Sequence, residues 1–218
     1  MQERAVKTRA RLLTTASQVF NERGYNRASV TEIAARAHST AGALYHHFSS
    51  KAGLAEEILA VDLTEGVEQN PGAPALQEWI DLGLLLTHRV QEDPQVKAAL
   101  QLAALDKPTR TWASPWASWK DTVTRPLLRA QQGGELLPRV ELAAVASLFM
   151  TNWVGGESLT SGDDHAVKTQ MNNFFTYTLP GVATPGVLSR LDYSPERGLL
   201  LREQFSLGAS PDTTLVPA

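Results

Sequence analysis

Apolar residues recur every three or four positions along most of this 218-residue chain, which is the spacing of an amphipathic helix. In residues 3–23 the pattern places Leu12, Ala16 and Val19 on one face, and Gly24 follows as a common helix stop. No stretch of any length alternates apolar and polar residues as a half-buried strand does, and no internal repeat is present. The pattern predicts an all-α protein.

Further helices are expected wherever this spacing resumes between turn-forming residues. Asp93-Pro94 should start one of them, because proline suits the first position of a helix. Residues 180–185, which begin and end with proline, should interrupt another. The expected helices cover residues 30–37, 41–47, 51–65, 75–92, 94–106, a segment ending near 132, 139–159 and 164–178, with one or two short helices in 187–207.

Residues 29–51 contain two short helices joined by a tight turn. Ser29 and Glu32 have the spacing of a capping box, and Ser39 or Thr40 can cap the second helix. Two short helices joined in this way form a helix-turn-helix unit, whose second helix enters the DNA major groove. The alternative is an ordinary helical hairpin packed in a core.

The second of these helices has a surface suited to DNA. Leu44 and Phe48 lie four residues apart and can anchor it to a core. Gly42 has no side chain, so a phosphate could approach the N-terminal N–H groups closely. The side chains expected to reach phosphates or base edges from this helix are Thr40, Ala41, Tyr45 and His46.

Basic residues are concentrated around the same unit. Residues 1–51 contain eight Lys or Arg and three Glu, an excess of +5, whereas the whole chain has a net charge of -3 and the remainder therefore carries −8. Phosphate neutralisation supplies most non-specific DNA affinity, so a basic head is expected on a DNA-binding protein. A solvated charged face is the alternative. The candidate backbone contacts are Arg4, Lys7, Arg11, Arg27, Ser29 and Lys51, and Tyr25 could either pack or contact phosphate.

Several function classes are disfavoured. The chain has no Cys, which excludes disulfides and thiolate metal sites. His46 and His47 are adjacent on a helix and point about 100° apart, so no metal or other cofactor is expected. The apolar, uncharged run of residues 142–156 is too short and too polar to span a bilayer, and no signal peptide is recognised, so a cytoplasmic protein is expected. No common catalytic motif occurs, which leaves an enzyme or a non-DNA-binding interaction module as weaker alternatives.

The segment TAGALYHHFSSKAGL, which starts at Thr40, resembles the T-K-G-A-L-Y-x-H-F-x-S-K-E-x-L signature of TetR-type repressors. The preceding stretch TRARLLTTASQVFNERGYNRASVTEIAARA is similar to the first two helices of that family. The resemblance implies a three-helix DNA-binding head in residues 1–50 and a ligand-binding and dimerising helical body in residues 51–208, followed by a disordered tail in 209–218. This chain departs from the signature at Ala41, His46 and Gly53, and in the turn at His38-Ser39.

The body has a second resemblance. SPWASWKDTVTRPLLRAQQGGELLP and TNWVGGES are similar to the γ-butyrolactone autoregulator receptors, a TetR branch. The resemblance implies a homodimeric repressor of secondary-metabolite genes that a lactone or butenolide signal releases from a pseudo-palindromic DNA operator. A pseudo-receptor that senses an antibiotic or another hydrophobic molecule is the alternative. The resemblance implies a pocket residue at Trp119 and one near the pocket at Thr151, and the complete set of expected ligand contacts is Trp119, Thr151, Leu84, Trp116 and Asp62.

Two interpretations of the apolar residues stay open. Each tryptophan could line a ligand pocket or pack in a core. Small and large residues alternate in 143–156 and 174–177, a mixture that suits a helix–helix dimer interface but also suits an internal core helix.

Overall fold

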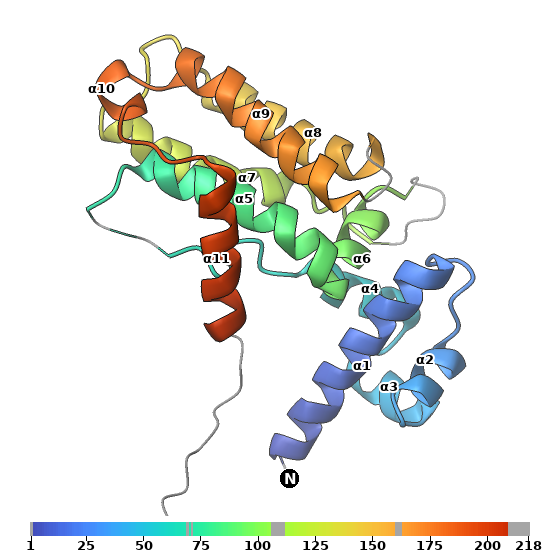
Figure 1. Ribbon diagram of the computed structural model, residues 1–218. Coiled ribbons are helices and arrows are strands. Elements are labelled where there is room, and N and C mark those ends of the chain that lie inside the picture. Colours follow the sequence, from blue (N-terminus) through green and yellow to red (C-terminus); the bar gives the residue numbers. More distant parts are fainter. Residues whose placement is uncertain (1, 69, 71, 106–111, 160–162, 209–218) are drawn as a thin grey trace, which may run out of the picture. The chain divides into compact units, whose positions relative to one another are not determined.

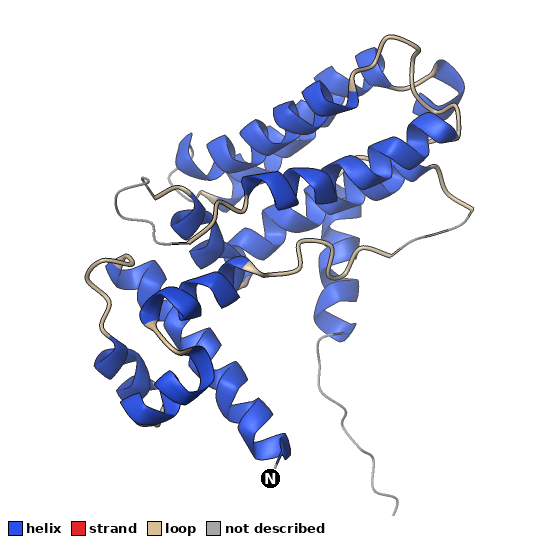
Figure 2. Cartoon of the chain, turned by 180° about the vertical axis from the view of Figure 1, so that it is seen from behind, coloured by secondary structure: helices blue, strands red, loops and turns tan. Residues whose placement is uncertain are grey.

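The computed structural model describes every residue except 1, 69, 71, 106–111, 160–162 and 209–218 (Figure 1). The described residues form helices and no strand, as Figure 2 shows, so the all-α prediction is confirmed. The helices are α1 (Gln2–Arg23), α2 (Val30–Arg36), α3 (Ala41–Phe48), α4 (Lys51–Leu59), α5 (Ala75–Glu92), α6 (Pro94–Ala103), α7 (Trp116–Gln132), α8 (Leu142–Leu159), α9 (Asp164–Val182), α10 (Pro185–Leu188) and α11 (Pro195–Gly208).

The chain forms two compact units. The first contains Met1–Asp62 and Arg89–Trp119, and the second contains Leu63–His88 and Lys120–Ala218. The boundaries therefore fall inside α5 and α7, and α6 belongs with the first four helices. No described helix combines the length and apolar character needed to cross a membrane.

The first unit is built around α1, which contacts α2, α3, α4 and α6. Its apolar face is buried, with Leu12 and Phe20 in the core against Ile33 of α2 and Leu44 of α3. Gly24 ends the helix with φ +73°, a left-handed conformation that costs glycine little. α6 is joined to this core by a hydrogen bond from the Asn21 side-chain amide to the carbonyl of Pro94, at 2.9 Å.

The core of the second unit is aromatic. Trp79 of α5 lies 5.4 Å, centroid to centroid, from both Phe149 of α8 and Phe175 of α9, and Phe174 completes the cluster. Gly83 of α5 makes this packing possible, because a Cβ there would lie 2.7 Å from Phe175 Cζ and 2.9 Å from Phe149 Cε2.

Helix α11 is held against α5 by a polar clasp. Arg197 makes two hydrogen bonds of 2.5 Å to the Asp81 carboxylate, which raises the pKa of Arg197. Gln77 completes the clasp through its side-chain amide, which donates to Asp81 at 2.9 Å and to the Asp192 carbonyl at 2.7 Å. The Asp192 N–H returns a 2.8 Å bond to the Gln77 amide oxygen. Buried polar groups that pair in this way fix the position of a helix more narrowly than apolar contact does.

Some predicted helix bounds are wrong. α4 ends at Leu59 rather than 65, because its last N–H bonds close at Ala60 and Val61 and the chain then turns. α9 continues past Pro180 to Val182. Proline removes one helical N–H, and the helix tolerates this loss here because Pro180 lies in its last turn, with only two helical residues after it. α8 starts at Leu142 rather than 139. α6 ends at Ala103 rather than near 106, where the Ala104 N–H closes the last turn on the Leu100 carbonyl. The tail 209–218 lies outside the described residues.

Candidate DNA interface and ligand cavity

Side-chain caps determine where the two helix-turn-helix helices begin. The Ser29 hydroxyl accepts the Glu32 N–H at 3.1 Å and starts α2. The Glu32 carboxylate accepts from Arg36 at 2.8 Å. The Thr40 hydroxyl accepts the Ala43 N–H at 3.1 Å and starts α3, and between the helices His38 turns the chain with φ +47°.

One face of α3 is free for DNA. Leu44 and Phe48 are buried, whereas Tyr45 keeps 49% of its surface exposed and His46 is also exposed. Thr40 and Gly42 are exposed at the N-terminal end of the helix, and Ala41 beside them is half-buried. A Cβ at Gly42 would meet only the Thr40 hydroxyl, at 3.9 Å. No contact within the described protein requires glycine at this position. This supports the interpretation that a phosphate approaches the helix N-terminus at Gly42.

The chain after α3 makes a very tight turn. Ser49 has φ 59° and ψ -38°, and the Ser50 N–H reaches back to the Phe48 carbonyl at 2.6 Å, the geometry of a strained γ-turn. The Ser50 hydroxyl then caps α4 by accepting the Gly53 N–H at 2.9 Å. A Cβ at Gly53 would lie 2.3 Å from the Phe48 carbonyl oxygen. Gly53 is thus required by this turn.

The cationic side chains of the head fall into two groups. Arg4, Arg11 and Arg27 are exposed and have no hydrogen bond or ion pair within the described residues, so they are available for phosphates. Lys7 pairs with Glu3 at 2.7 Å, but both side chains are largely exposed and such a pair adds little stability. The other arginines of the head form ion pairs with carboxylates of the same unit: Arg9 with Glu57, Arg23 with Glu32, and Arg36 with both Glu22 and Glu32.

Tyr25 packs inside the first unit. Its ring contacts Phe20 at 5.4 Å and Trp112 at 4.7 Å, both edge to face. The Lys51 ammonium lies over the same ring and 3.5 Å from the Asn26 carbonyl, and burial lowers the pKa of Lys51. Of the two roles considered for Tyr25, the structure supports packing.

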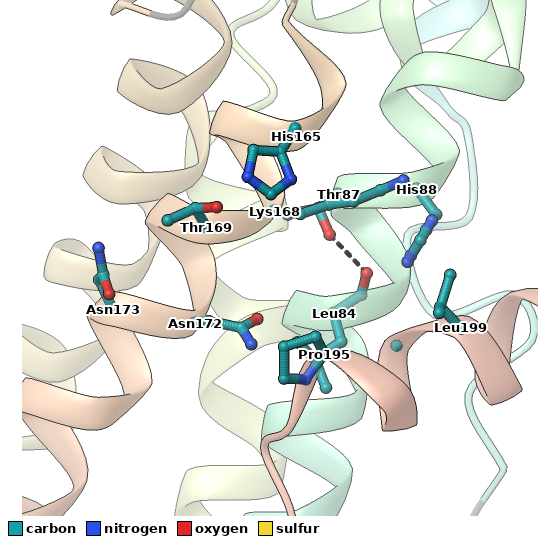
Figure 3. Close-up of a pocket in the computed structure, with 11 residues that line it drawn as sticks. Leu84, Thr87, His88, His165, Lys168, Thr169, Asn172, Asn173, Pro195 and Leu199 are labelled. Carbon is teal, nitrogen blue, oxygen red and sulfur yellow. Dashed lines mark hydrogen bonds between the residues drawn. The ribbon is translucent and has the colours of Figure 1, made fainter.

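A cavity of about 380 Å³ lies between α5, α9 and α11 in the second unit (Figure 3). Helix α5 contributes Leu84, Thr87 and His88. Helix α11 contributes Pro195, Gly198 and Leu199, and the Thr87 hydroxyl is occupied by a 2.6 Å bond to the Leu84 carbonyl. The residues that α9 contributes are His165, Lys168, Thr169, Asn172 and Asn173.

The expected ligand-contacting residues do not all line this cavity. Leu84 does. Trp119 is buried in the first unit, 5.3 Å from the Trp116 ring and edge to face with it. Thr151 is exposed on α8 and its hydroxyl donates to the Ser147 carbonyl at 2.9 Å, while Asp62 is exposed and its carbonyl accepts from Arg89. Sequence reasoning missed His88 and Lys168, although a histidine among the apolar residues of α5 was a usable signal.

Helices α8 and α9 pack together and expose large apolar side chains. Leu148 is 58% exposed and Tyr177 is 83% exposed. Phe149, Trp153 and Phe175, which sequence reasoning considered for the same interface, are instead buried in the core. The core interpretation is therefore confirmed for these three residues, and the dimer interface stays a prediction for the exposed faces. Among the described residues, no group of three or more acidic or histidine side chains could hold a metal ion.

Comparison with known proteins agrees with this geometry. Residues 12–58 match the family described as bacterial regulatory proteins, tetR family. The chain is 29% identical over 192 residues to the A-factor receptor protein of Streptomyces griseus, covering 87% of this chain and 69% of that protein.

Solved structures extend the likeness to almost the whole chain. A structure of full-length TylP, a TetR regulator from Streptomyces fradiae, is 33% identical and has a TM-score of 0.80 over 93% of this chain and 99% of that one. A gamma-butyrolactone receptor, described as an ArpA-like protein, is 25% identical with a TM-score of 0.70 over 92% and 99%. These relatives are regulators, in keeping with the expectation that the chain is not an enzyme. The chain belongs to the TetR family of bacterial transcriptional regulators.

Proposed function

We propose that this regulator is a ligand-responsive repressor. It binds a pseudo-palindromic operator as a homodimer, and a γ-butyrolactone or butenolide-type signal releases it, which controls secondary-metabolite genes. The observation that carries the DNA-binding part of this proposal is the exposed face of α3, which runs from the N-cap residue Thr40 through Gly42 to Tyr45. Residues 1–50 act as the DNA-binding part and residues 51–208 as the ligand-binding and dimerising part, and a repressor of this kind works in the cytoplasm.

The head supplies contacts to the phosphate backbone and contacts to base edges. Thr40, Ala41 and Gly42 form the N-terminus of α3, where N–H groups and the helix dipole favour a phosphate. Tyr45 and His46 are placed for base edges or phosphate. Arg4, Lys7, Arg11, Arg27, Ser29 and Lys51 contact the phosphate backbone on either side.

A homodimer is supported by the apolar face of α8 and α9. Leu148 and Tyr177 leave two large, mainly apolar side chains exposed on these helices, and exposed apolar surface of this kind often marks an interaction site. A second copy that covers this face would create a two-fold symmetric pair of heads, and such a dimer reads a symmetric operator.

The ligand class rests on the relatives. One is a receptor for A-factor and another is a gamma-butyrolactone receptor, and both align with most of this chain. Release then requires only that the ligand bind more tightly to a conformation that does not fit the operator. Of the residues expected to contact a lactone, Trp119 and Trp116 lie side by side in the first unit, and these two are the contacts that we propose.

A gel-shift experiment tests the proposal. The wild-type protein should retard a duplex that covers the promoter of its own gene, and a synthetic γ-butyrolactone or butenolide should abolish the shift. Tyr45→Phe removes one hydroxyl and should weaken the shift, by about 1–3 kcal/mol if that contact is desolvated. Thr40→Ser, which keeps the hydroxyl that caps α3, is the matched control and should bind close to wild type. A protein that retards its own promoter no better than unrelated DNA would contradict the operator assignment.

A further inference from the structure

We propose that the cavity between α5, α9 and α11 binds a small amphipathic carboxylate, with the negative end toward α9 and the apolar end against α5 and α11. The inference rests on the proposed function in one respect, because it names a ligand class for a ligand-responsive protein. It concerns a different site from the Trp119 region, and it can be tested without DNA.

The charge of the cavity lining selects the negative end. Lys168 and His165 on α9 and the buried His88 on α5 are nitrogen bases, and no Asp or Glu is among the lining residues whose side chains the structure describes. Figure 3 shows Lys168 directed from α9 toward α5. Hydrogen bonds in which one partner is ionised are about twice as strong as neutral ones, so an acid is favoured over an ester or a lactone of the same size.

Amide and hydroxyl groups extend the polar side of the cavity. Asn172 lies four residues after Lys168 and three after Thr169 on α9, and all three line the same space. The Thr87 hydroxyl donates to the Leu84 carbonyl, so its oxygen remains able to accept a hydrogen bond from a ligand hydroxyl. A hydroxy acid would therefore find a partner for each of its polar groups.

The opposite side of the cavity is apolar. Leu84, Pro195 and Leu199 form it, and Gly198 adds no side chain. The volume of about 380 Å³ lies in the lower part of the range of about 300–1,000 Å³ that is usual for small-molecule sites. A short alkyl chain fits such a surface, whereas a fully polar metabolite would leave it without apolar contact.

The wall that α11 provides is held in place before any ligand arrives. The Arg197–Asp81 pair fixes α11 to α5 one residue before Gly198. Gly198 allows the close approach, because a Cβ there would lie 3.2 Å from His88 Nε2. A preformed site avoids the entropic cost of ordering a segment during binding.

The test compares two probes with one carbon skeleton. 4-Hydroxydecanoate and γ-decalactone differ only in whether the ring is open, so the open form alone carries a carboxylate. Isothermal titration of the full-length protein without DNA should show the hydroxy acid binding about tenfold more tightly than the lactone. Equal affinities, or no binding of either probe, would overturn the proposal.

Two variants locate the binding site. Lys168→Met removes the charge and keeps the length, and it should raise the Kd for 4-hydroxydecanoate about tenfold with little effect on the Kd for γ-decalactone. Lys120→Met changes another half-buried lysine of the second unit outside the cavity and should leave both Kd values unchanged. Asn172→Leu keeps the charge and removes the amide, so a weaker binding of the hydroxy acid would support the site even if Lys168→Met did not fold. Wild-type affinity in a folded Lys168→Met would place the acid elsewhere.

The outcome is separable from that of the proposed function. If the hydroxy acid binds in a Lys168-dependent way but no lactone loosens the operator complex, the carboxylate site in the cavity is supported and the proposed lactone signal is contradicted. If lactones release the protein from the operator while the hydroxy acid does not bind, the lactone signal is supported and the carboxylate site is contradicted.

Discussion

The ammonium group of Lys51 lies 4.4 Å from the centre of the Tyr25 ring. Tyr25 is itself packed against Phe20 and Trp112. The side chain of Lys51, the first residue of α4 and a proposed phosphate contact, is therefore held in place by this ring. A cation placed in advance loses less side-chain entropy when it meets DNA than a fully mobile lysine does.

We expect Lys51→Gln to weaken operator binding and to make that binding less sensitive to alkaline pH. Burial lowers the pKa of Lys51 below 10.5, so the charge is lost at a lower pH than in an ordinary lysine. Wild-type affinity should fall as the pH rises toward 10.5, and the fall should be smaller in the variant. Fluorescence anisotropy with a labelled operator measures the affinity of the wild type and of the variant at each pH. If the affinities of the two proteins change with pH in parallel, Lys51 does not contact the phosphates.

The two groups of arginines should differ in their effect on salt dependence. Arg27 is free, so Arg27→Gln should reduce the slope of log K against log salt by about 0.9. Arg9 is paired with Glu57 at 2.5 Å and lies over the Phe48 ring, so Arg9→Gln should leave the slope unchanged. The slope is measured from operator titrations at several salt concentrations, and equal slopes in both variants would remove Arg27 from the interface.

Gly42→Ala and Gly53→Ala form a matched pair with opposite expected effects. Gly42 faces open space, so alanine there should leave stability unchanged or raise it by up to about 1 kcal/mol, while operator affinity falls. At Gly53 a Cβ would meet the Phe48 carbonyl, so alanine should destabilise the head by about 1–3 kcal/mol. Urea unfolding and operator titration separate the two effects, and undiminished operator binding by Gly42→Ala would show that no phosphate comes close at this point.

Charge on the exposed face of α8 and α9 should separate the dimer. Leu148→Glu combined with Tyr177→Glu should give a monomer by size-exclusion light scattering, because two carboxylates would be buried against their copies. Leu128→Glu, at another exposed leucine of the second unit, is the control and should stay dimeric. A wild-type protein that is already a monomer at micromolar concentration would exclude the dimer altogether.

Trp119→Ala distinguishes the two proposed ligand regions. If the lactone contacts Trp119, the variant should bind operator as the wild type does but should no longer be released by lactone. Trp119 is buried against Trp116, so a melting curve must first show that the variant folds. Normal release in a folded Trp119→Ala, together with lost release in Lys168→Met, would move the signal to the cavity of α5, α9 and α11.

Features determined by neighbouring residues could be predicted from the sequence. The cap at Ser29, the helix start at Asp93-Pro94, the stop at Gly24 and the limits of α5 are confirmed, because each depends on interactions within one turn of a helix. The sequence left Ser39 or Thr40 open as the cap of α3, and Thr40 is the residue whose backbone is extended at that point.

Features that depend on tertiary packing could not be predicted in the same way. Helical spacing placed Phe149, Phe175 and Tyr177 together as large residues, but only the packing of α8 against α9 decides that Tyr177 is exposed and the phenylalanines are buried. The cavity joins His88 to Lys168 and Gly198, which belong to three helices separated by long stretches of chain. No local pattern relates residues at such separations.

The missing side chain at Gly83 has a consequence for the evolution of this protein. Because a Cβ at this position would overlap the rings of Phe175 and Phe149, the sizes of residues 83 and 175 are coupled. A larger residue at 83 needs a smaller residue at 175 and a shifted or smaller one at 149, so no single one of these changes is neutral. Among homologues these positions should therefore covary, with glycine at 83 accompanying the two phenylalanines and alanine at 83 accompanying smaller residues.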